Sequence, residues 1–352
     1  MALPIALPLE PMLARAVPEV PRPRRLGELS YEPKWDGFRC IVARDGNEVE
    51  LWSRSRKRLT GYFPEVVAAS RRFLPGQVVL DAELVVRSGP PGAQRLDWEA
   101  LSLRIHPSAK RVAGLAEQTP AELVCFDLLA LADLDLMPLP QRERRDALVQ
   151  LLGGLPDDAP IHVTRATDDP AEAEAWFAQF EGAGLDGVIA KQTDAPYSPG
   201  QRTMSKIKHA RTAEAVVIGY GLSKGTRARA GSVGSIHLGL YDDGELIPVG
   251  GIGAWPDAVR TQLADVLAPL VLEGAEAEAA PRPNELTRTG VREFVPVRPE
   301  LVVEVAFDQL EGRRFRHAVQ FVRWRPDREP TSCTLDQVER APAYDLDAVL
   351  RP

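Results

Sequence analysis

Residues 34–39, Lys-Trp-Asp-Gly-Phe-Arg, place a possible nucleophile, the Lys34 amine, among groups that can hold an anion. A lysine amine becomes nucleophilic only when burial or neighbouring cations lower its pKa. Asp36 could hold a metal ion or position a phosphate, and Gly37 would allow a ligand to approach the backbone. Arg39 could form a forked pair with a phosphate or a ribose. Such a hexamer also occurs by chance on exposed strand edges, so its meaning depends on the segments that follow.

Two carboxylates, Asp81 and Glu83, lie inside the otherwise apolar run 78–86. A buried carboxylate costs free energy unless it is paired or bound to a ligand. The spacing of two places both side chains on one face of a strand, which favours a functional role. Phe126 and Asp127 occupy a second apolar run, where a core phenylalanine is the simpler explanation.

A carboxylate and an amine also stand at the two ends of a short predicted strand, Asp186 to Lys191. Arg202, Lys206 and Lys208 follow, and the two lysines share one strand face. Paired lysines on a strand form a natural cradle for phosphate, although a solvated strand edge would carry the same residues. Only seven of the 43 basic residues are lysines, and four of these lie in the segments named so far.

Two further segments are rich in arginine. Ser53-Arg54 is followed at once by Arg56, Lys57 and Arg58, and residues 323–328 read Arg-Trp-Arg-Pro-Asp-Arg. Taken alone, each segment could be a solvated basic turn.

Up to about residue 208, the pattern predicts strands joined largely by hairpins and mixed with helices, which indicates an α+β domain. Residues 1–28 are rich in proline and are expected to form an extended lead-in. Asp169 and Pro170 are typical of a helix N-cap and first turn. Strands are predicted over 31–54 with a turn at 45–47, and from Gln77, from Ala121, over 187–192 and over 204–209. Helices are predicted over 63–74, 140–155 and 169–184.

Beyond residue 208, five short strands and one helix fit a small five-stranded barrel of the OB type. We expect three parts: 1–208, a barrel domain over 209–340 and a surface tail over 341–352. The acidic stretch 273–283 is expected to be a surface loop. The predicted strands are 213–221, 235–243, 245–253, 300–309 and 317–324, with the helix at 255–271.

The composition excludes several classes of protein. The chain has 352 residues, enough for two domains, with 44 % hydrophobic and 26 % charged residues. It lacks the run of about 18 apolar residues that a membrane span needs, and its N-terminus lacks a basic signal-peptide region. Cys40, Cys125 and Cys333 lie too far apart for a metal motif, which favours a cytoplasmic protein. The net charge of −7 argues against a uniformly basic surface.

Together these segments resemble the covalent nucleotidyltransferases, which comprise DNA ligases, RNA ligases and mRNA capping enzymes. The shared order is KxDGxR, SR, a DxE strand, FD, DGxxxK, KxK and RxDR, spread over about residues 30–330. The strings EPKWDGFR, GLDGVIAK and FVRWRPDR are most similar to small bacterial LigC-type ATP-dependent DNA ligases. That resemblance implies an ATP-grasp-like adenylation domain, with antiparallel sheets and flanking helices, followed by an OB-fold barrel.

The resemblance also implies a role for each matching residue. Lys34 would attack the α-phosphate of ATP and carry AMP, with Asp36 and Lys208 as further catalytic residues. Asp186 and Glu83 would serve a divalent metal, Mg²⁺ or Mn²⁺. The ATP contacts would be Glu32 and Phe126 at the adenine, Arg39 and Glu83 at the ribose, Arg54, Arg202, Lys206 and Lys208 at the phosphates, and Arg325, Asp327 and Arg328 at the departing pyrophosphate.

Two positions depart from the family pattern. Asp186 stands where the superfamily usually has glutamate, and its shorter side chain could reach a metal through water. Arg328 stands where lysine is commoner, which preserves charge but alters geometry.

The implied substrate is nicked double-stranded DNA, sealed by a monomer through an adenylated 5′ end, in DNA repair and at the nucleoid when engaged. The remaining alternatives are an RNA ligase, a GTP-dependent capping-type enzyme, or a non-catalytic nucleic-acid-binding relative. The pathway, and partners such as a Ku-like protein or a polymerase, stay open. The candidate DNA contacts are Arg54, Arg56, Lys57, Arg58, Lys224, Arg227, Arg313, Arg314 and Arg316.

Overall fold

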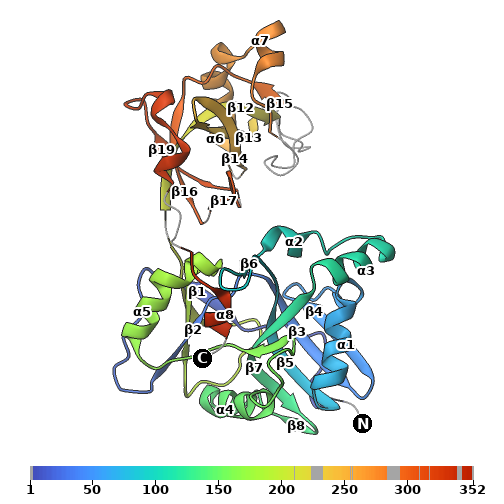
Figure 1. Ribbon diagram of the computed structural model, residues 1–352. Helices are drawn as coiled ribbons and strands as arrows, with labels where there is room; N and C mark the ends of the chain where they lie inside the picture. The colour runs from blue at the N-terminus through green and yellow to red at the C-terminus, as the bar shows by residue number, and fades with distance from the viewer. Residues whose placement is uncertain are drawn as a thin grey trace. The chain divides into compact units, whose positions relative to one another are not determined.

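The chain divides into two units in the computed structural model, and each is described by itself (Figure 1). The first unit comprises Met1–Lys208 together with Ala341–Pro352, and the second comprises His209–Arg340. No helix among the described residues is long and apolar enough to cross a membrane. The structure describes residues 3–209, 211–222, 233–253, 255, 257–283, 294–308, 310–316, 318–338 and 343–350.

Two sheets form the first unit. The seven-stranded sheet has the order β4-β3-β5-β7-β8, with β6 on β5 and β9 on β7, and the four-stranded sheet has the order β1-β11-β10-β2. Most neighbouring strands are antiparallel, as predicted; β1–β11 and β7–β9 are parallel. The strands are β1 Leu13–Ala16, β2 Leu29–Pro33, β3 Phe38–Asp45, β4 Glu48–Ser53, β5 Gln77–Ser88, β6 Arg95–Leu96, β7 Ala121–Leu131, β8 Leu134–Asp135, β9 Ile161–Val163, β10 Val188–Gln192 and β11 Arg202–Ile207.

The helices of the first unit include the three predicted ones. Asp169 caps α5 by accepting a hydrogen bond from the Ala171 amide, as its position before a proline predicts. Two short helices, α2 and α3, were not predicted; Asp97 and Ser108 cap them in the same way. The helices are α1 Pro64–Phe73, α2 Trp98–Ser102, α3 Ala109–Gln118, α4 Gln141–Leu152, α5 Pro170–Gln179 and α8 Leu346–Leu350, with 3-10 turns at Thr60–Tyr62 and Phe180–Ala183.

Strands β5 and β7 are apolar on both faces because both faces are covered. On one face, residues such as Leu80 and Leu128 pack with side chains of α1 and α4. On the other face, Val79 and Ala130 pack with Met204 of the four-stranded sheet. The two sheets therefore pack together on the face that α1 and α4 leave free.

Asp127 has a structural explanation that the sequence pattern did not supply. Its carboxylate accepts hydrogen bonds from two of the three Arg144 guanidinium nitrogens, Nε at 2.8 Å and Nη2 at 2.9 Å. Asp127 is only 2 % exposed and Arg144 is fully buried. A buried charge requires such a partner, so this pair ties α4 to β7.

The N-terminal residues are more than an extended lead-in. Strand β1 hydrogen-bonds in parallel to β11, with Ala14 opposite Met204 and Ala16 opposite Lys206. Met12, just before β1, is buried and helps to hold this strand of only four residues in place.

The second unit contains the five predicted strands, and its described residues form three more, β15, β17 and β18. Its sheet has the order β14-β13-β12-β16-β19, and β15, a strand not predicted, pairs with β12. The acidic stretch expected to be a loop contains a helix, α7, because its alanines and glutamates are good helix formers. The elements are β12 Arg211–Leu222, β13 Val233–Asp242, β14 Glu245–Ile252, α6 Asp257–Leu267, α7 Gly274–Ala279, β15 Phe294–Pro296, β16 Val302–Phe307, β17 Leu310–Glu311, β18 Arg314–Phe315 and β19 Gln320–Trp324, with 3-10 turns at Ala268–Leu270, Pro330–Ser332 and Leu335–Gln337.

A surface tail was expected at 341–352, but its described residues, 343–350, pack against the rest of the first unit. Leu346 and Val349 of α8 are fully buried, in a cluster that contains Trp176 and Phe180. Asp347 pairs with Arg87 at 2.7 Å, and the Leu346 amide donates to the Gln94 carbonyl at 2.9 Å. The short apolar helix is therefore part of the core, which its length of five residues did not suggest.

Leu346→Ala should lower the free energy of unfolding of the first unit by about 2–5 kcal/mol, since it leaves a cavity in a packed cluster. Urea unfolding followed by circular dichroism measures this change. Leu26→Ala is the matched control, because Leu26 is 88 % exposed and the same truncation there should cost little. Equal stability of the two variants would show that α8 does not contribute to the core.

Candidate active site

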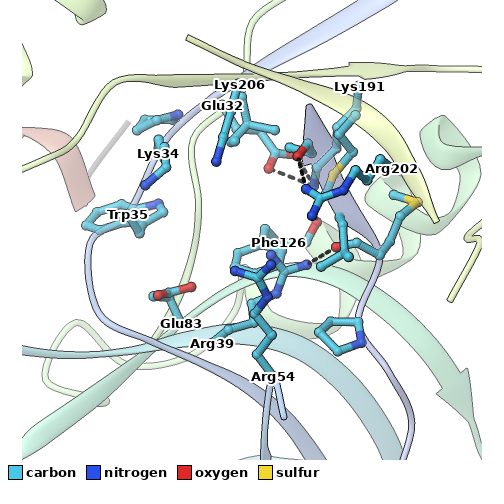
Figure 2. A pocket seen from close by; sticks show the side chains of 17 residues that line it. Glu32, Lys34, Trp35, Arg39, Arg54, Glu83, Phe126, Lys191, Arg202 and Lys206 are labelled. Atoms are coloured by element: carbon cyan, nitrogen blue, oxygen red, sulfur yellow. Dashed lines mark hydrogen bonds and ion pairs between the residues drawn. The ribbon is translucent and has the colours of Figure 1, made fainter. Parts of the chain in front are cut away.

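A cavity of about 180 Å³ lies within the first unit, and most of the predicted nucleotide-binding residues line it. The four-stranded sheet contributes Glu32, Lys191 and Lys206, and the seven-stranded sheet contributes Arg39 and Glu83. Figure 2 shows Lys34 and Lys206 on one side of this cavity, facing Arg39, Arg54 and Glu83 on the other. The lining residues are Pro11, Met12, Leu13, Ala14, Glu32, Pro33, Lys34, Trp35, Arg39, Arg54, Glu83, Phe126, Ile189, Lys191, Arg202, Met204 and Lys206.

Lys34 begins a short loop, residues 34–37, between β2 and β3. Two backbone hydrogen bonds fasten this loop to the turn before β10: Lys34 N–H donates to Gly187 O at 2.8 Å, and Asp186 N–H donates to Lys34 O at 3.0 Å. The side chains join as well, with Lys34 Nζ at 2.5 Å from Asp186 Oδ2. Three contacts therefore fix the candidate nucleophile to a segment 152 residues away in sequence.

The glycines of the two Asp-Gly pairs are required by close backbone packing. A Cβ on Gly187, whose φ is +131°, would lie 1.9 Å from the Ile207 carbonyl oxygen. A Cβ on Gly37 would lie 2.0 Å from the Leu84 carbonyl oxygen. Gly37 was expected to make room for a ligand; in the structure it makes room for strand β5.

Asp186 lies between two ammonium groups. Lys208 Nζ is 2.8 Å from the same carboxylate oxygen that Lys34 contacts. Burial alone would raise the pKa of Asp186, but Lys34 and Lys208 together hold it below its ordinary value. Partial burial and the neighbouring cations Lys208, Lys34 and Arg54 lower the pKa of Lys206.

The two carboxylates of β5 have different surroundings. Asp81 is fully buried, and its carboxylate accepts hydrogen bonds from Arg39 Nε at 2.5 Å and Nη2 at 2.6 Å. Glu83 faces the cavity and accepts a hydrogen bond from the Gly37 amide at 3.2 Å. Burial raises the pKa of Glu83 to about 7, although Arg39 and Lys34 act to lower it. Glu83 therefore changes charge near neutral pH.

Phe126 belongs to the cavity wall rather than to the core. The Arg39 guanidinium carbon lies 4.4 Å from the centre of its ring, and Lys191 Nζ lies 5.1 Å from it. Lys191 also donates to the Phe126 carbonyl at 3.0 Å and pairs with Glu32 at 2.7 Å. Glu32 and Lys191 are both buried, so each neutralises the other at the inner end of the cavity.

Several predicted residues lie outside the cavity lining. Asp36 is partly buried in the loop after Lys34 and does not line the cavity. Lys208 does not line the cavity but contacts Asp186, whose carboxylate also holds Lys34. Arg325 belongs to the second unit, where it contacts Asp327 at 2.8 Å and also Glu214; Arg328 lies 3.9 Å from Glu214.

The candidate DNA-binding residues are mostly exposed. Residues 54–58 are exposed after β4, but Arg58 pairs with Glu50 at 2.5 Å and Arg56 lies 4.0 Å from Glu10. In the second unit, Arg313 pairs with Asp242, and burial lowers the pKa of Arg316 to about 10. Arg314 is partly buried in β18. The predicted contacts Lys224 and Arg227 lie outside the described residues.

Sequence reasoning missed part of the cavity wall. Residues 11–14, Ile189 and Met204 carry no chemical signature, although strand alternation could have placed Ile189 on the same face as Lys191. Lys191 was noted but given no role.

No cluster of three or more possible metal ligands occurs among the described residues. Mg²⁺ is commonly held by one or two carboxylates together with substrate phosphates. Asp186 or Glu83 could supply such a carboxylate, so the donor set fits a metal that arrives with a nucleotide.

Comparison with known proteins agrees with this geometry. The ATP dependent DNA ligase domain matches residues 11–208, and the ATP dependent DNA ligase C terminal region matches residues 229–328. DNA ligase C1 of Mycolicibacterium smegmatis is 50 % identical over 356 residues, with 99 % of each chain covered. DNA ligase C of Mycobacterium tuberculosis is 48 % identical over 366 residues, again with 99 % of each covered. A solved structure of a Lig E DNA ligase, 18 % identical, has a TM-score of 0.53 over 89 % of this chain and 99 % of that one, a likeness of fold. The chain is a member of the ATP-dependent DNA ligase family.

Proposed function

We propose that the protein is an ATP-dependent DNA ligase that seals nicks through AMP carried on Lys34, in DNA repair. The observation that supports this most directly is the position of Lys34. Its amine lines a cavity of nucleotide-binding character, and three contacts with Asp186 and Gly187 fix it there.

The chemistry consists of three displacements at phosphorus. The Lys34 nitrogen forms a bond to the α-phosphorus of ATP, the α–β oxygen bridge breaks, and pyrophosphate leaves with the bonding electrons. The DNA 5′-phosphate then attacks the AMP phosphorus, and the nitrogen–phosphorus bond breaks. Finally the 3′-hydroxyl attacks the activated 5′-phosphate, and AMP departs. Each step concentrates negative charge, which fixed cations stabilise.

The residues around the cavity divide this work by their chemistry. Phe126 offers an aromatic face to the base, and Glu32 offers an acceptor at the inner end. Arg39 and Glu83 would hold the ribose. Arg54, Arg202, Lys206 and Lys208 would hold the phosphates; among the described residues, Arg54 and Lys206 pair with no carboxylate and are available to an anion.

The Lys34 ammonium must give up a proton to solvent before the amine attacks, since a protonated nitrogen has no free electron pair, and its ion pair with Asp186 is lost with that proton. Mg²⁺ or Mn²⁺, held by the nucleotide phosphates with Asp186 or Glu83, would supply charge neutralisation. Asp36 would act from the loop beside Lys34.

The two units would then be an adenylation domain, 1–208, and an OB-type barrel, 209–340. In that arrangement Arg325, Asp327 and Arg328 would act on the departing pyrophosphate. Arg325 and Asp327 are already oriented toward each other, since Asp327 accepts hydrogen bonds from Arg325 and its pKa is lowered to about 2. Unlike Lys34, this set belongs to the second unit and would act only with that unit beside the nucleotide.

Lys34→Ala should abolish transfer of label from α-labelled ATP to the protein, because the proposed bond to AMP is made by the Lys34 nitrogen. The measurement is acid-labile label retained on denatured protein in the presence of Mg²⁺. Lys110→Ala, a change of an exposed lysine of α3, should label like wild type. Label on Lys34→Ala, or none on AMP-free wild type, would refute the proposal.

Glu83→Gln should raise the KM for ATP in label transfer, and only at the higher pH values. Glu83 gains its charge as pH rises through a pKa of about 7, so the wild-type advantage over the uncharged glutamine appears above that value. The KM for ATP of Glu83→Gln divided by that of wild type, measured about one unit on either side of pH 7, should therefore be larger on the alkaline side. An equal ratio on both sides would mean that the Glu83 charge is not used.

Binding of nicked DNA should weaken steeply with added salt, because cation–phosphate contacts release bound counterions. Lys57→Ala should make the slope of log affinity against log salt shallower by about one. Lys110→Ala, again the control, should leave the slope unchanged. A flat salt response of the wild type would contradict a backbone-tracking mode of binding.

A further inference from the structure

A closed ring of hydrogen bonds lies behind one wall of the cavity. The Met12 amide donates to the Tyr197 hydroxyl at 2.9 Å, and that hydroxyl donates to Asp81 Oδ2 at 2.6 Å. Asp81 accepts from Arg39 Nε at 2.5 Å and NH2 at 2.6 Å, and Arg39 NH2 closes the ring on the Met12 carbonyl at 3.2 Å. The ring joins residues far apart in the sequence: the N-terminal segment, β3, β5 and the loop before β11.

Only half of this ring faces the cavity. Met12 and Arg39 line it, whereas Tyr197 and Asp81 do not. Tyr197 is 4 % exposed and Asp81 is 0 % exposed. A bound nucleotide could therefore touch Met12 and Arg39, while the other two residues could act only through them.

The direction of the hydrogen bonds makes the Tyr197 hydroxyl hard to replace. It accepts from Met12 and donates to Asp81, and among these side chains only a hydroxyl can do both: a carboxylate only accepts and a guanidinium only donates. Burial, reinforced by Asp81, raises the pKa of Tyr197 well above its ordinary value, so the hydroxyl keeps the proton that it donates.

Tyr197 is itself held firmly from behind. Its amide donates to the Met137 carbonyl at 2.8 Å, and Arg144 lies 5.7 Å from the centre of its ring. Arg144 also donates to the Ala195 carbonyl at 3.2 Å and is fixed by Asp127. The buried Asp127–Arg144 pair thus supports the loop that carries Tyr197.

Resting on the proposed use of ATP, we propose that Tyr197 is a positioning residue for the nucleotide pocket, which holds Arg39 through Asp81 and holds the Pro11–Ala14 wall through the Met12 amide. The Arg39 guanidinium then stays 4.4 Å from the centre of the Phe126 ring, and the Pro11–Ala14 wall keeps its position at the edge of the pocket. Without the hydroxyl, the Met12 amide and Asp81 each lose a partner, and the wall gains freedom that nucleotide binding must remove. Losing preorganisation in this way weakens binding more than it slows the chemical step.

Tyr197→Phe removes only the hydroxyl and tests this assignment. The dissociation constant for ATP without Mg²⁺, measured by calorimetry, should rise about tenfold, the size expected for a hydrogen bond to a charged group. The KM for ATP in label transfer should rise in parallel, and the maximal labelling rate should change by less than about threefold. The matched control is Tyr31→Phe, since the Tyr31 hydroxyl is also buried and donates to the Pro21 carbonyl at 2.5 Å, outside the ring. It should cost similar thermal stability with unchanged ATP affinity.

A double-mutant cycle with Arg39→Lys separates positioning from general stability. If Tyr197 acts through Arg39, Tyr197→Phe in the Arg39→Lys background should raise the dissociation constant by much less than tenfold. Affinity of Tyr197→Phe equal to that of Tyr31→Phe, or fully additive effects in the cycle, would overturn the assignment. Wild type that binds ATP without taking label would overturn the chemistry at Lys34 but leave this test valid. Wild type that binds no ATP would overturn both.

Discussion

The site depends on one joint between two distant segments, the loop of Lys34 and the turn of Asp186 and Gly187. Two backbone hydrogen bonds and one ion pair hold them together. Gly37 and Gly187 let these two segments lie close to β5 and β11, because a Cβ at either position would collide with the backbone oxygen of Leu84 or Ile207. The joint places the end of β2 beside the start of β10, and from there β10 and β11 run past the cavity with Lys191 and Lys206. A flexible lysine is thereby presented on a rigid frame, which orients it before any substrate binds.

In the first unit, charged residues buried away from the cavity are paired differently from those that line it. Those behind the cavity wall occur in matched pairs, such as Asp127 with Arg144 and Arg104 with Glu65, because an unpaired buried charge costs several kcal/mol, on the order of 3–5. Those facing the cavity are in cationic excess, since six lysines and arginines line it against two glutamates. Partial burial and repulsion from Lys208, Lys34 and Arg54 together lower the pKa of Lys206, and bound phosphates would offset that repulsion.

The sequence predicted the helices, the strands and the type of reaction better than it predicted the contacts that hold the site residues in place. Period-two alternation located β5 and β7, an Asp-Pro pair located the start of α5, and the ordered motifs identified the family, which the comparisons confirm. The roles of individual residues remain proposals. What failed has physical causes. Strand β1 and helix α8 are short and gain their stability from tertiary packing, which no local pattern reveals. The Met12–Tyr197–Asp81–Arg39 ring joins four separate segments through polar atoms, and only the folded chain brings these together.

The joint between the Lys34 loop and the Asp186 turn explains why an aspartate fits at position 186. Its backbone amide is fixed to the Lys34 carbonyl at 3.0 Å, so its Cα lies close to the Lys34 loop and a short side chain already reaches Lys34 Nζ at 2.5 Å and Lys208 Nζ at 2.8 Å. A glutamate there would carry its carboxylate one methylene further from this fixed Cα. The shorter aspartate therefore favours ion pairs with Lys34 and Lys208 in the free site. An incoming nucleotide must compete with Asp186 for Lys34. Since Lys208 contacts the same oxygen, Asp186 can release Lys34 and still keep a partner, so opening the pair does not leave its carboxylate unpaired.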